Sequence, residues 1–283
     1  MAASHGKKTT RAPYDPARRR ALRLLATCSR GRTISPKSLH RLRSTLRRLQ
    51  AWLEVIGRHE AADHLAREIS RTSRLRSLQV FEDWLRRTQA PQKDLRRAAD
   101  ALREERARLA HADTFAAMRT TINAIRNWEM SDDLSPTHRI WTLYRQPLAK
   151  LLRKIRHNPK RKRLHQLRLQ LKLFRYTVEW AEPRTSANRE LIGRLKRSQR
   201  CLGAYEDLAA FRRLAKRWNL SIRPRINSRW RKARQFARAE ARHMSWLTQV
   251  LERQHEPIHA RVRTTHPRRE PNPASVNADL TSR

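Results

Sequence analysis

Apolar residues recur every three or four positions along almost the whole chain, the spacing that gathers them on one face of an α-helix. The clearest case is the segment from Leu39 to Glu54, which reads LHRLRSTLRRLQAWLE. The segment from Leu164 to Glu179 reads LHQLRLQLKLFRYTVE and repeats the same pattern of leucine, phenylalanine and valine positions. The pattern predicts an all-α fold that contains a duplicated helical unit.

Turn signals between the apolar stripes divide the chain into pieces of helical length. Ser35 and Pro36 are residue types that favour the N-cap and first position of the helix carrying the first copy. The helices predicted in the first half cover residues 16–28, 36–57, 59–71, 74–88, 92–110 and 115–130. Those predicted in the second half cover residues 136–156, 164–182, 187–200, 203–218 and 224–253.

A cationic stripe borders the apolar stripe in both copies, given a rotation of about 100° per helical residue. Its members are His40, Arg43 and Arg47 in the first copy and His165, Arg168, Lys172 and Arg175 in the second. Arginine offers a fork of donors to phosphate oxygens, lysine a mobile charge, and histidine a proton that it can gain beside an anion. The repeated arrangement therefore predicts helices that hold an anion.

The charge of the chain is strongly positive, and it is unevenly distributed. Lys and Arg total 66 against 25 Asp and Glu, a formal net charge of +41. Residues 15–57 contain 11 basic and 2 acidic side chains, and residues 137–182 contain 13 and 2, whereas residues 58–112 contain 13 and 9. Self-repulsion on this scale favours a polyanionic partner: nucleic acid, anionic lipid or polyphosphate. The two counter-charge-poor segments would line one shared cationic cleft.

The chain is expected to form one large domain with polar ends. Residues 1–14 are predicted to be disordered, residues 15–134 and 135–253 to form its two halves, and residues 254–283 to form a flexible Pro-rich tail. Cys28 and Cys201 are expected to be unpaired and buried, as in a reducing compartment. No 18-residue apolar run and no signal-peptide pattern is visible, so a cytoplasmic location is expected.

The two copies resemble the signatures of the CHAD family, an α-helical domain named for its conserved histidines. His40, Arg43, Arg47 and Arg48 fit the first signature; His165, Arg168, Lys172, Arg175, Tyr176 and Glu179 fit the second. Leu202, Gly203 and Asp207 match an L-G-x-x-x-D segment that often follows the second signature. In the first half, Gln50 replaces a usual arginine, and Thr72, Ser73 and Ser77 stand near the places of the L-G-x-x-x-D residues.

The resemblance implies two antiparallel, four-helix-type bundles related by a pseudo-twofold axis around a basic pore or cleft that binds inorganic polyphosphate. It implies binding without catalysis, with recruitment to polyphosphate granules as a further possibility. The implied contacts are His40, Arg43, Arg47, Arg48, His165, Arg168, Lys172, Arg175 and Tyr176. Additional candidates are Arg19, Arg20, Arg23, Lys150, Arg153, Lys154 and Arg197.

Several of these side chains also have a purely structural interpretation. The two motif histidines could be satisfied within helix interfaces, and Tyr176 could pack at the rim of the cleft instead of donating to phosphate. Glu54 and Glu179 could orient neighbouring cations or form ordinary surface pairs. The 8 tryptophans fit core or boundary positions better than base-stacking platforms.

A non-enzymatic protein without metal or cofactor is expected, because no phosphate-binding loop, nucleophile motif or carboxylate cluster is recognisable. The stretch from His255 to His259 spells H-E-x-x-H, but Pro257 opposes the helix that a zinc site would need. The alternative function is nucleic-acid binding through the same basic surface. No helix-turn-helix or aromatic RNA-binding motif supports it.

Overall fold

Eleven helices account for nearly all of the chain that the structure describes, which is residues 15–30, 34–111, 114–125, 136–181 and 185–253 of a computed structural model. The first half contains α1 (Asp15–Arg30), α2 (Pro36–Val55), α3 (His59–Arg71), α4 (Ser73–Arg87), α5 (Gln92–His111) and α6 (Thr114–Ala124). The second half contains α7 (Pro136–His157), α8 (Arg161–Ala181), α9 (Ser186–Arg217), α10 (Arg223–Arg242) and α11 (Ser245–Arg253). No strand occurs in these residues, and the predicted all-α class is confirmed.

Helix α2 begins where the sequence predicts it. The Ser35 hydroxyl accepts a hydrogen bond from the Ser38 backbone N–H at 3.1 Å, and Pro36 occupies the first turn. The apolar stripe of α2 is fully buried from Leu39 to Leu53, so the 3.6-residue period predicted both the helix and its inward face.

Two of the predicted helix boundaries are wrong. The segments 187–200 and 203–218 form the single helix α9, and Gly203 lies inside it. A Cβ at Gly203 would lie 3.4 Å from Nε of Arg168, so glycine gives that guanidinium room against the helix. Conversely, residues 224–253 form two helices, because the chain turns at His243 and Met244. The turn allows Leu247 of α11 to pack in the core that includes α7.

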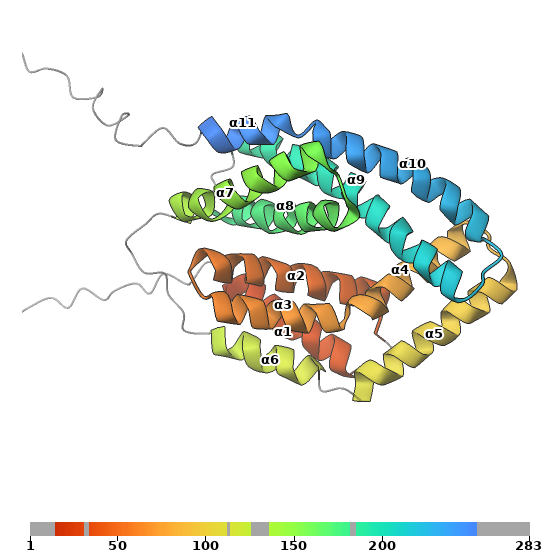
Figure 1. The fold of residues 1–283 in the computed structure, drawn as a ribbon. Coiled ribbons are helices and arrows are strands. Elements are labelled where there is room, and N and C mark those ends of the chain that lie inside the picture. The colour runs from red at the N-terminus through yellow and green to blue at the C-terminus, as the bar shows by residue number, and fades with distance from the viewer. Residues whose placement is uncertain (1–14, 31–33, 112–113, 126–135, 182–184, 254–283) are drawn as a thin grey trace, which may run out of the picture.

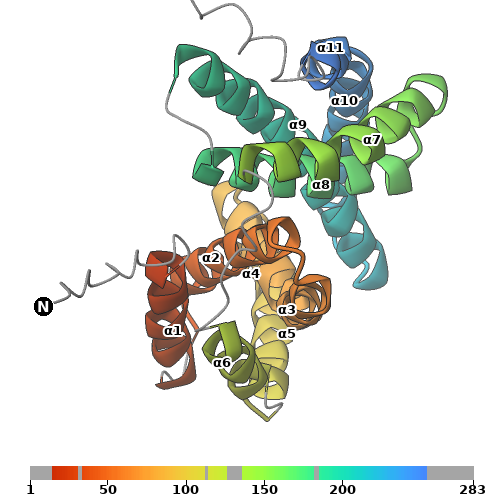
Figure 2. The same cartoon turned by 90° about the vertical axis from the view of Figure 1, so that its left-hand side faces the viewer.

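The helices of the second half follow those of the first in the same order. Helices α7, α8, α10 and α11 take the places of α1, α2, α5 and α6, and the long α9 takes the place of α3 and α4 together. The pseudo-twofold rotation itself stays a prediction. The correspondence matters because α2 and α8, the two repeat helices, pack directly against each other at the centre (Figures 1 and 2).

An aromatic cluster joins the halves at the end of the molecule where α4 and α5 meet α9 and α10 (Figure 1). The ring centroid of Phe211 lies 5.0 Å from the ring centroid of Phe81 and 5.5 Å from that of Trp84. Buried Asp94 of α5 accepts hydrogen bonds from the Ser221 hydroxyl at 2.9 Å and the Ile222 N–H at 3.2 Å. The halves are therefore fixed to each other at this end as well as along α2 and α8.

The two cysteines are free, as expected, but they differ in burial. Cys28 is buried, and burial raises the pKa of its thiol to about 11. Cys201 is only half-buried, which corrects the expectation that both are buried.

None of the helices that the structure describes is long and apolar enough to cross a membrane. The predicted disordered segment 1–14 and the predicted tail 254–283, including the H-E-x-x-H stretch, lie outside the described residues.

Candidate functional site

A groove with a volume of about 890 Å³ runs between the two halves, and we call it the cationic groove. Its walls come from α2, α8 and α9. Among its described lining residues, Asp207 is the sole carboxylate. The basic side chains of the lining are His40, Arg48, Arg168, Lys172, Arg175, Lys196, Arg197 and Arg200; Ser44, Tyr176, Gly193, Gln199, Gly203, Ala204 and Asp207 complete it.

Lys172 is the focus of the positive charge in the groove. Burial, followed by the charges of Arg168, Arg47, Arg43 and Arg175, lowers the pKa of its ammonium to about 7. These four arginines come from both repeat helices, α2 and α8. Cations held together in a partly desolvated place raise each other's free energy, and an anion placed among them would relieve that cost.

Arg43 is anchored to the junction between α3 and α4. Its guanidinium donates to the Ile69 carbonyl, to the Thr72 hydroxyl and, at 3.2 Å, to the Ser73 hydroxyl. Burial, and then the charges of Arg47, Arg76 and other neighbours, lowers its pKa to about 10. Arg43 does not line the groove. Its guanidinium already donates hydrogen bonds to three groups at the junction of α3 and α4.

Arg47 begins a polar chain that runs along α2 into the second half. It donates to the Gln50 side chain, Gln50 donates to Glu54 at 3.0 Å, and the Tyr144 hydroxyl donates to Glu54 at 3.0 Å. Burial raises the pKa of Glu54, although the hydrogen bonds from Tyr144 and Gln50 oppose the rise. Gln50, which replaces a usual arginine of the signature, therefore relays the contact between Arg47 and Glu54.

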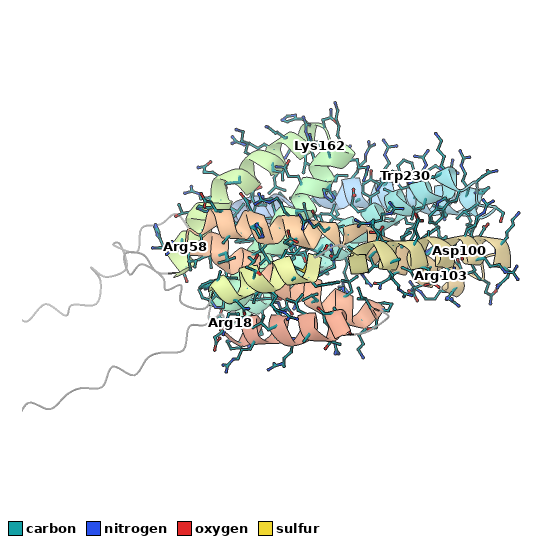
Figure 3. All side chains as sticks on the ribbon, turned by 90° about the horizontal axis from the view of Figure 1, so that it is seen from below. Arg18, Arg58, Asp100, Arg103, Lys162 and Trp230 are labelled. Atoms are coloured by element: carbon teal, nitrogen blue, oxygen red, sulfur yellow. The ribbon has the colours of Figure 1, made fainter. Side chains whose placement is uncertain are left out.

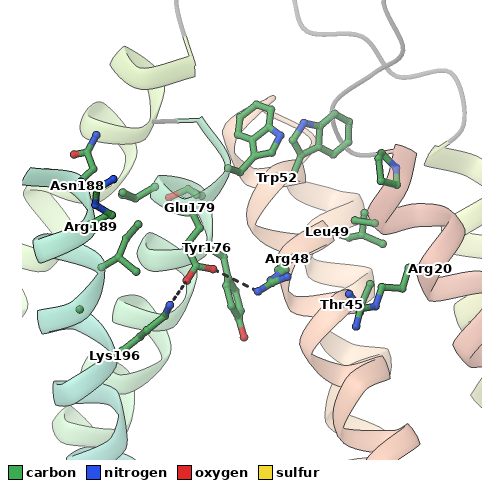
Figure 4. A pocket seen from close by; sticks show the side chains of 17 residues that line it. Arg20, Thr45, Arg48, Leu49, Trp52, Tyr176, Glu179, Asn188, Arg189 and Lys196 are labelled. Atoms are coloured by element: carbon green, nitrogen blue, oxygen red, sulfur yellow. Dashed lines mark hydrogen bonds and ion pairs between the residues drawn. The ribbon is translucent and has the colours of Figure 1, made fainter. Parts of the chain in front are cut away.

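Glu179, the counterpart of Glu54 in the repeat, organises the cations of the other copy. Its carboxylate lies 2.9 Å from Arg175. It also lies 3.3 Å from Lys196 and 3.5 Å from Arg48, as the dashed lines in Figure 4 mark. The buried ring of Tyr176 is contacted by the guanidinium groups of Arg175, 4.5 Å from its centroid, and Arg48, 5.3 Å away. One carboxylate among three cations fixes their positions and leaves a surplus of positive charge.

The two motif histidines have opposite surroundings. His40 lines the groove, and its pKa is lowered by burial and then by the charges of Arg76, Lys172 and Arg43. The Nδ1 atom of His165 lies 3.3 Å from Glu206, which also pairs with Arg161 at 3.2 Å. Burial raises the pKa of Glu206, but these two partners outweigh it and the net shift is downward. His165 thus already has a carboxylate partner within the protein.

The predicted site residues therefore fall into three groups. The groove lining contains His40, Arg48, Arg168, Lys172, Arg175, Tyr176 and the additional candidate Arg197. Arg43 and Arg47 lie close enough to shift the pKa of Lys172 without lining the groove, and His165 is paired away from it. The other candidates are outside the described lining: Arg19, Arg20, Arg23, Lys150, Arg153 and Lys154.

The position of α1 and α7 explains this last group. The repeat helices α2 and α8 pack against each other, so the helix that precedes each of them is displaced from the centre (Figure 1). Arg19 instead pairs with Asp15 at 2.9 Å, and Arg20 lines a different cleft. The expectation that whole helix pairs line the cleft is corrected: α9 supplies the third wall.

From α9, sequence reasoning selected only Arg197 as a contact, and it noted Gly203 and Asp207 as part of a motif; it selected nothing from α4. Lys196 and Arg200 of α9 also line the groove, and Arg76 of α4 acts electrostatically on His40 and Asp207. The signal was present, because Gly193, Lys196, Arg200, Gly203 and Asp207 follow each other at helical spacing. It was hidden by the predicted break in this helix.

No cluster of three or more His, Cys, Asp or Glu side chains that could hold a metal ion occurs in the residues for which coordinates are described. The lining of the groove itself offers a set of convergent N–H donors and positive charges.

Comparison with known proteins agrees with the fold. The model of the CHAD domain matches residues 17–216. A solved structure, described as the crystal structure of the CHAD domain from the plant Ricinus communis, superposes with a TM-score of 0.54 at 17% sequence identity. The match covers 81% of this chain and 89% of that one. No curated protein matches the sequence. With most of its length matched by the family model, the chain belongs to the CHAD domain family.

Proposed function

We propose that this protein binds inorganic polyphosphate in the cationic groove and does so without catalysing a reaction. The observation that carries the proposal is Lys172, whose pKa is lowered to about 7 by burial and by four arginines drawn from both repeat helices. A phosphate chain entering the groove would bring charge-assisted hydrogen bonds and would remove the repulsion among these cations.

The lack of a free aromatic ring in the described groove lining favours a phosphate chain over a nucleic acid. Single-stranded nucleic acids gain affinity by stacking bases on exposed aromatic rings. Tyr176, the aromatic residue of the groove lining, is buried and carries a guanidinium against its ring. Inorganic polyphosphate has no bases to accommodate and presents an anion at every unit. Nucleic-acid binding through the same basic surface is the alternative.

Competition at one fixed salt concentration separates the two functions. Long-chain polyphosphate should displace labelled single-stranded RNA when the two are compared at equal phosphate concentration. Polyphosphate binding should also weaken as salt is raised, because binding releases condensed counterions. Displacement of polyphosphate by RNA under these conditions would favour the alternative. In the cell, binding of this kind would recruit the protein to polyphosphate granules.

The affinity for polyphosphate should fall by roughly tenfold or more between pH 7 and pH 9, because Lys172 loses its charge in this interval in the free protein. Bound phosphate favours the charged ammonium and raises its pKa, so binding takes up a proton above pH 7. Affinity must then decrease as the pH rises. The arginines that surround Lys172 stay charged across this range, and His40, with its lowered pKa, stays neutral.

The variant Lys172→Arg is the matched control, because arginine keeps its charge across the whole interval. Its affinity should be nearly constant from pH 7 to pH 9 when measured by calorimetry in buffers of equal ionic strength. A fall of equal size in the variant and in the native protein would assign the pH dependence to other groups.

A further inference from the structure

A second cavity, with a volume of about 720 Å³, lies beside the cationic groove, and we call it the apolar cleft (Figure 4). It opens between α1 and α2 of the first half and α8 and α9 of the second. Its apolar wall includes Ala17, Leu49, Trp52, Trp180 and Ile192. A cavity of this size, lined by aromatic and aliphatic side chains with a few polar groups, has the properties of a small-molecule site.

The apolar cleft adjoins the cationic groove. Four residues line both cavities: Arg48, Tyr176, Gly193 and Lys196. Gly193 contributes no side chain at the junction, and a Cβ placed there would meet nothing within 4 Å. A ligand can therefore extend from one cavity into the other past the backbone of α9.

The polar groups of the cleft give such a ligand a direction. Glu179 lines the apolar cleft but not the groove, and it is held there by Arg48, Arg175 and Lys196. Its carboxylate repels a phosphate that enters the cleft, whereas the groove attracts it. The same carboxylate can accept hydrogen bonds from hydroxyl or amino groups of an uncharged ligand part.

We infer that the two cavities together bind a nucleoside polyphosphate, with the base and sugar in the apolar cleft and the phosphates in the cationic groove. Half-buried Trp180 offers a flat surface on which a base can stack, whereas Trp52 is buried and only completes the apolar wall. Glu179 offers the acceptor that ribose hydroxyls need. A prenyl diphosphate would also combine an apolar part with phosphates, but its hydrocarbon chain could not donate a hydrogen bond to Glu179.

The inference rests on the proposed function for its phosphate half, and the test separates the two. ATP and inorganic tripolyphosphate carry the same number of phosphates, so their affinities for the full chain, measured by calorimetry, isolate the contribution of the nucleoside. ATP should bind about tenfold more tightly than tripolyphosphate, the gain expected from stacking one base on an aromatic side chain. Farnesyl diphosphate, compared with inorganic diphosphate, should show no such gain.

Two variants, one in each half of the protein, test whether the tighter binding of ATP arises in the apolar cleft. Ala17→Phe fills the cleft from α1, and Ile192→Glu adds a second carboxylate from α9; both side chains are half-buried and neither lines the groove. Each variant should bind ATP and tripolyphosphate equally. Ala17→Phe should leave tripolyphosphate affinity unchanged, whereas the carboxylate of Ile192→Glu, beside the junction at Gly193, should lower the affinity for both ligands. Equal affinities in the native protein, or an ATP preference that survives both variants, would overturn the inference. Loss of tripolyphosphate and polyphosphate binding altogether would instead contradict the proposed function.

Discussion

Changing Arg168, Lys172 and Arg175 together to glutamine should lower the affinity for long-chain polyphosphate by about 100-fold or more. The three side chains lie on consecutive turns of α8, and all of them line the cationic groove. Each can make a charge-assisted hydrogen bond to phosphate, and such bonds contribute more than neutral ones. Fluorescence anisotropy with labelled polyphosphate at fixed salt measures the change, and circular dichroism establishes that the helices persist.

The matched control removes the same number of charges from the outer surface. Arg86, Arg87 and Arg103 are 65%, 66% and 78% exposed, and each forms an ion pair within its own helix. Arg103 and its partner Asp100 lie on α5, at the opposite end of the molecule from Arg18 of α1 (Figure 3), and neither lines the cationic groove. Exposed pairs of this kind contribute little to stability. Changing these three arginines to glutamine should reduce polyphosphate affinity only slightly.

Equal losses in the two triple variants would mean that polyphosphate responds to the total charge of +41 and not to the groove. The comparison therefore tests the position of the site independently of the salt dependence. It does not depend on which of the three cations contributes most.

The variant Phe81→Ala should lower the free energy of unfolding by about 3–5 kcal/mol, the usual range for removing a fully buried phenylalanine side chain. Phe81 is 0% exposed, and its ring contacts Trp84, Phe211 and Trp218 in the aromatic cluster shared by the two halves. The neighbouring rings are large and belong to α4 and to the C-terminal part of α9, so they cannot easily close the cavity. Urea unfolding followed by circular dichroism measures the loss.

Phe236→Ala makes the same chemical change on the surface. The ring of Phe236 on α10 is 69% exposed, so its removal should change the free energy of unfolding by less than about 0.5 kcal/mol. A loss of similar size in both variants would show that the aromatic cluster does not hold the halves together.

The sequence by itself determined the helical class, the repeat helices and the identity of most groove cations. The apolar period of residues 39–53 and 164–178 is local information, because a helix places residues three and four apart on one face whatever surrounds it. The N-cap of α2 was predictable for the same reason, since Ser35 and Ser38 are three residues apart. The excess of positive charge in these segments follows directly from the number of basic and acidic residues in the sequence.

Only the tertiary structure decided which cations face the groove and which are already satisfied. Arg43 and Arg168 hold equivalent places in the repeat, yet Arg43 donates to residues near Thr72 whereas Arg168 lies against Gly203. His40 faces positive neighbours, but His165 faces Glu206. The two copies have the same local pattern and differ in the residues that α4 and α9 bring to them from distant parts of the chain. The apolar cleft likewise exists only because α1 and α2 approach α8 and α9, an arrangement that depends on packing between the halves and leaves no period in the sequence.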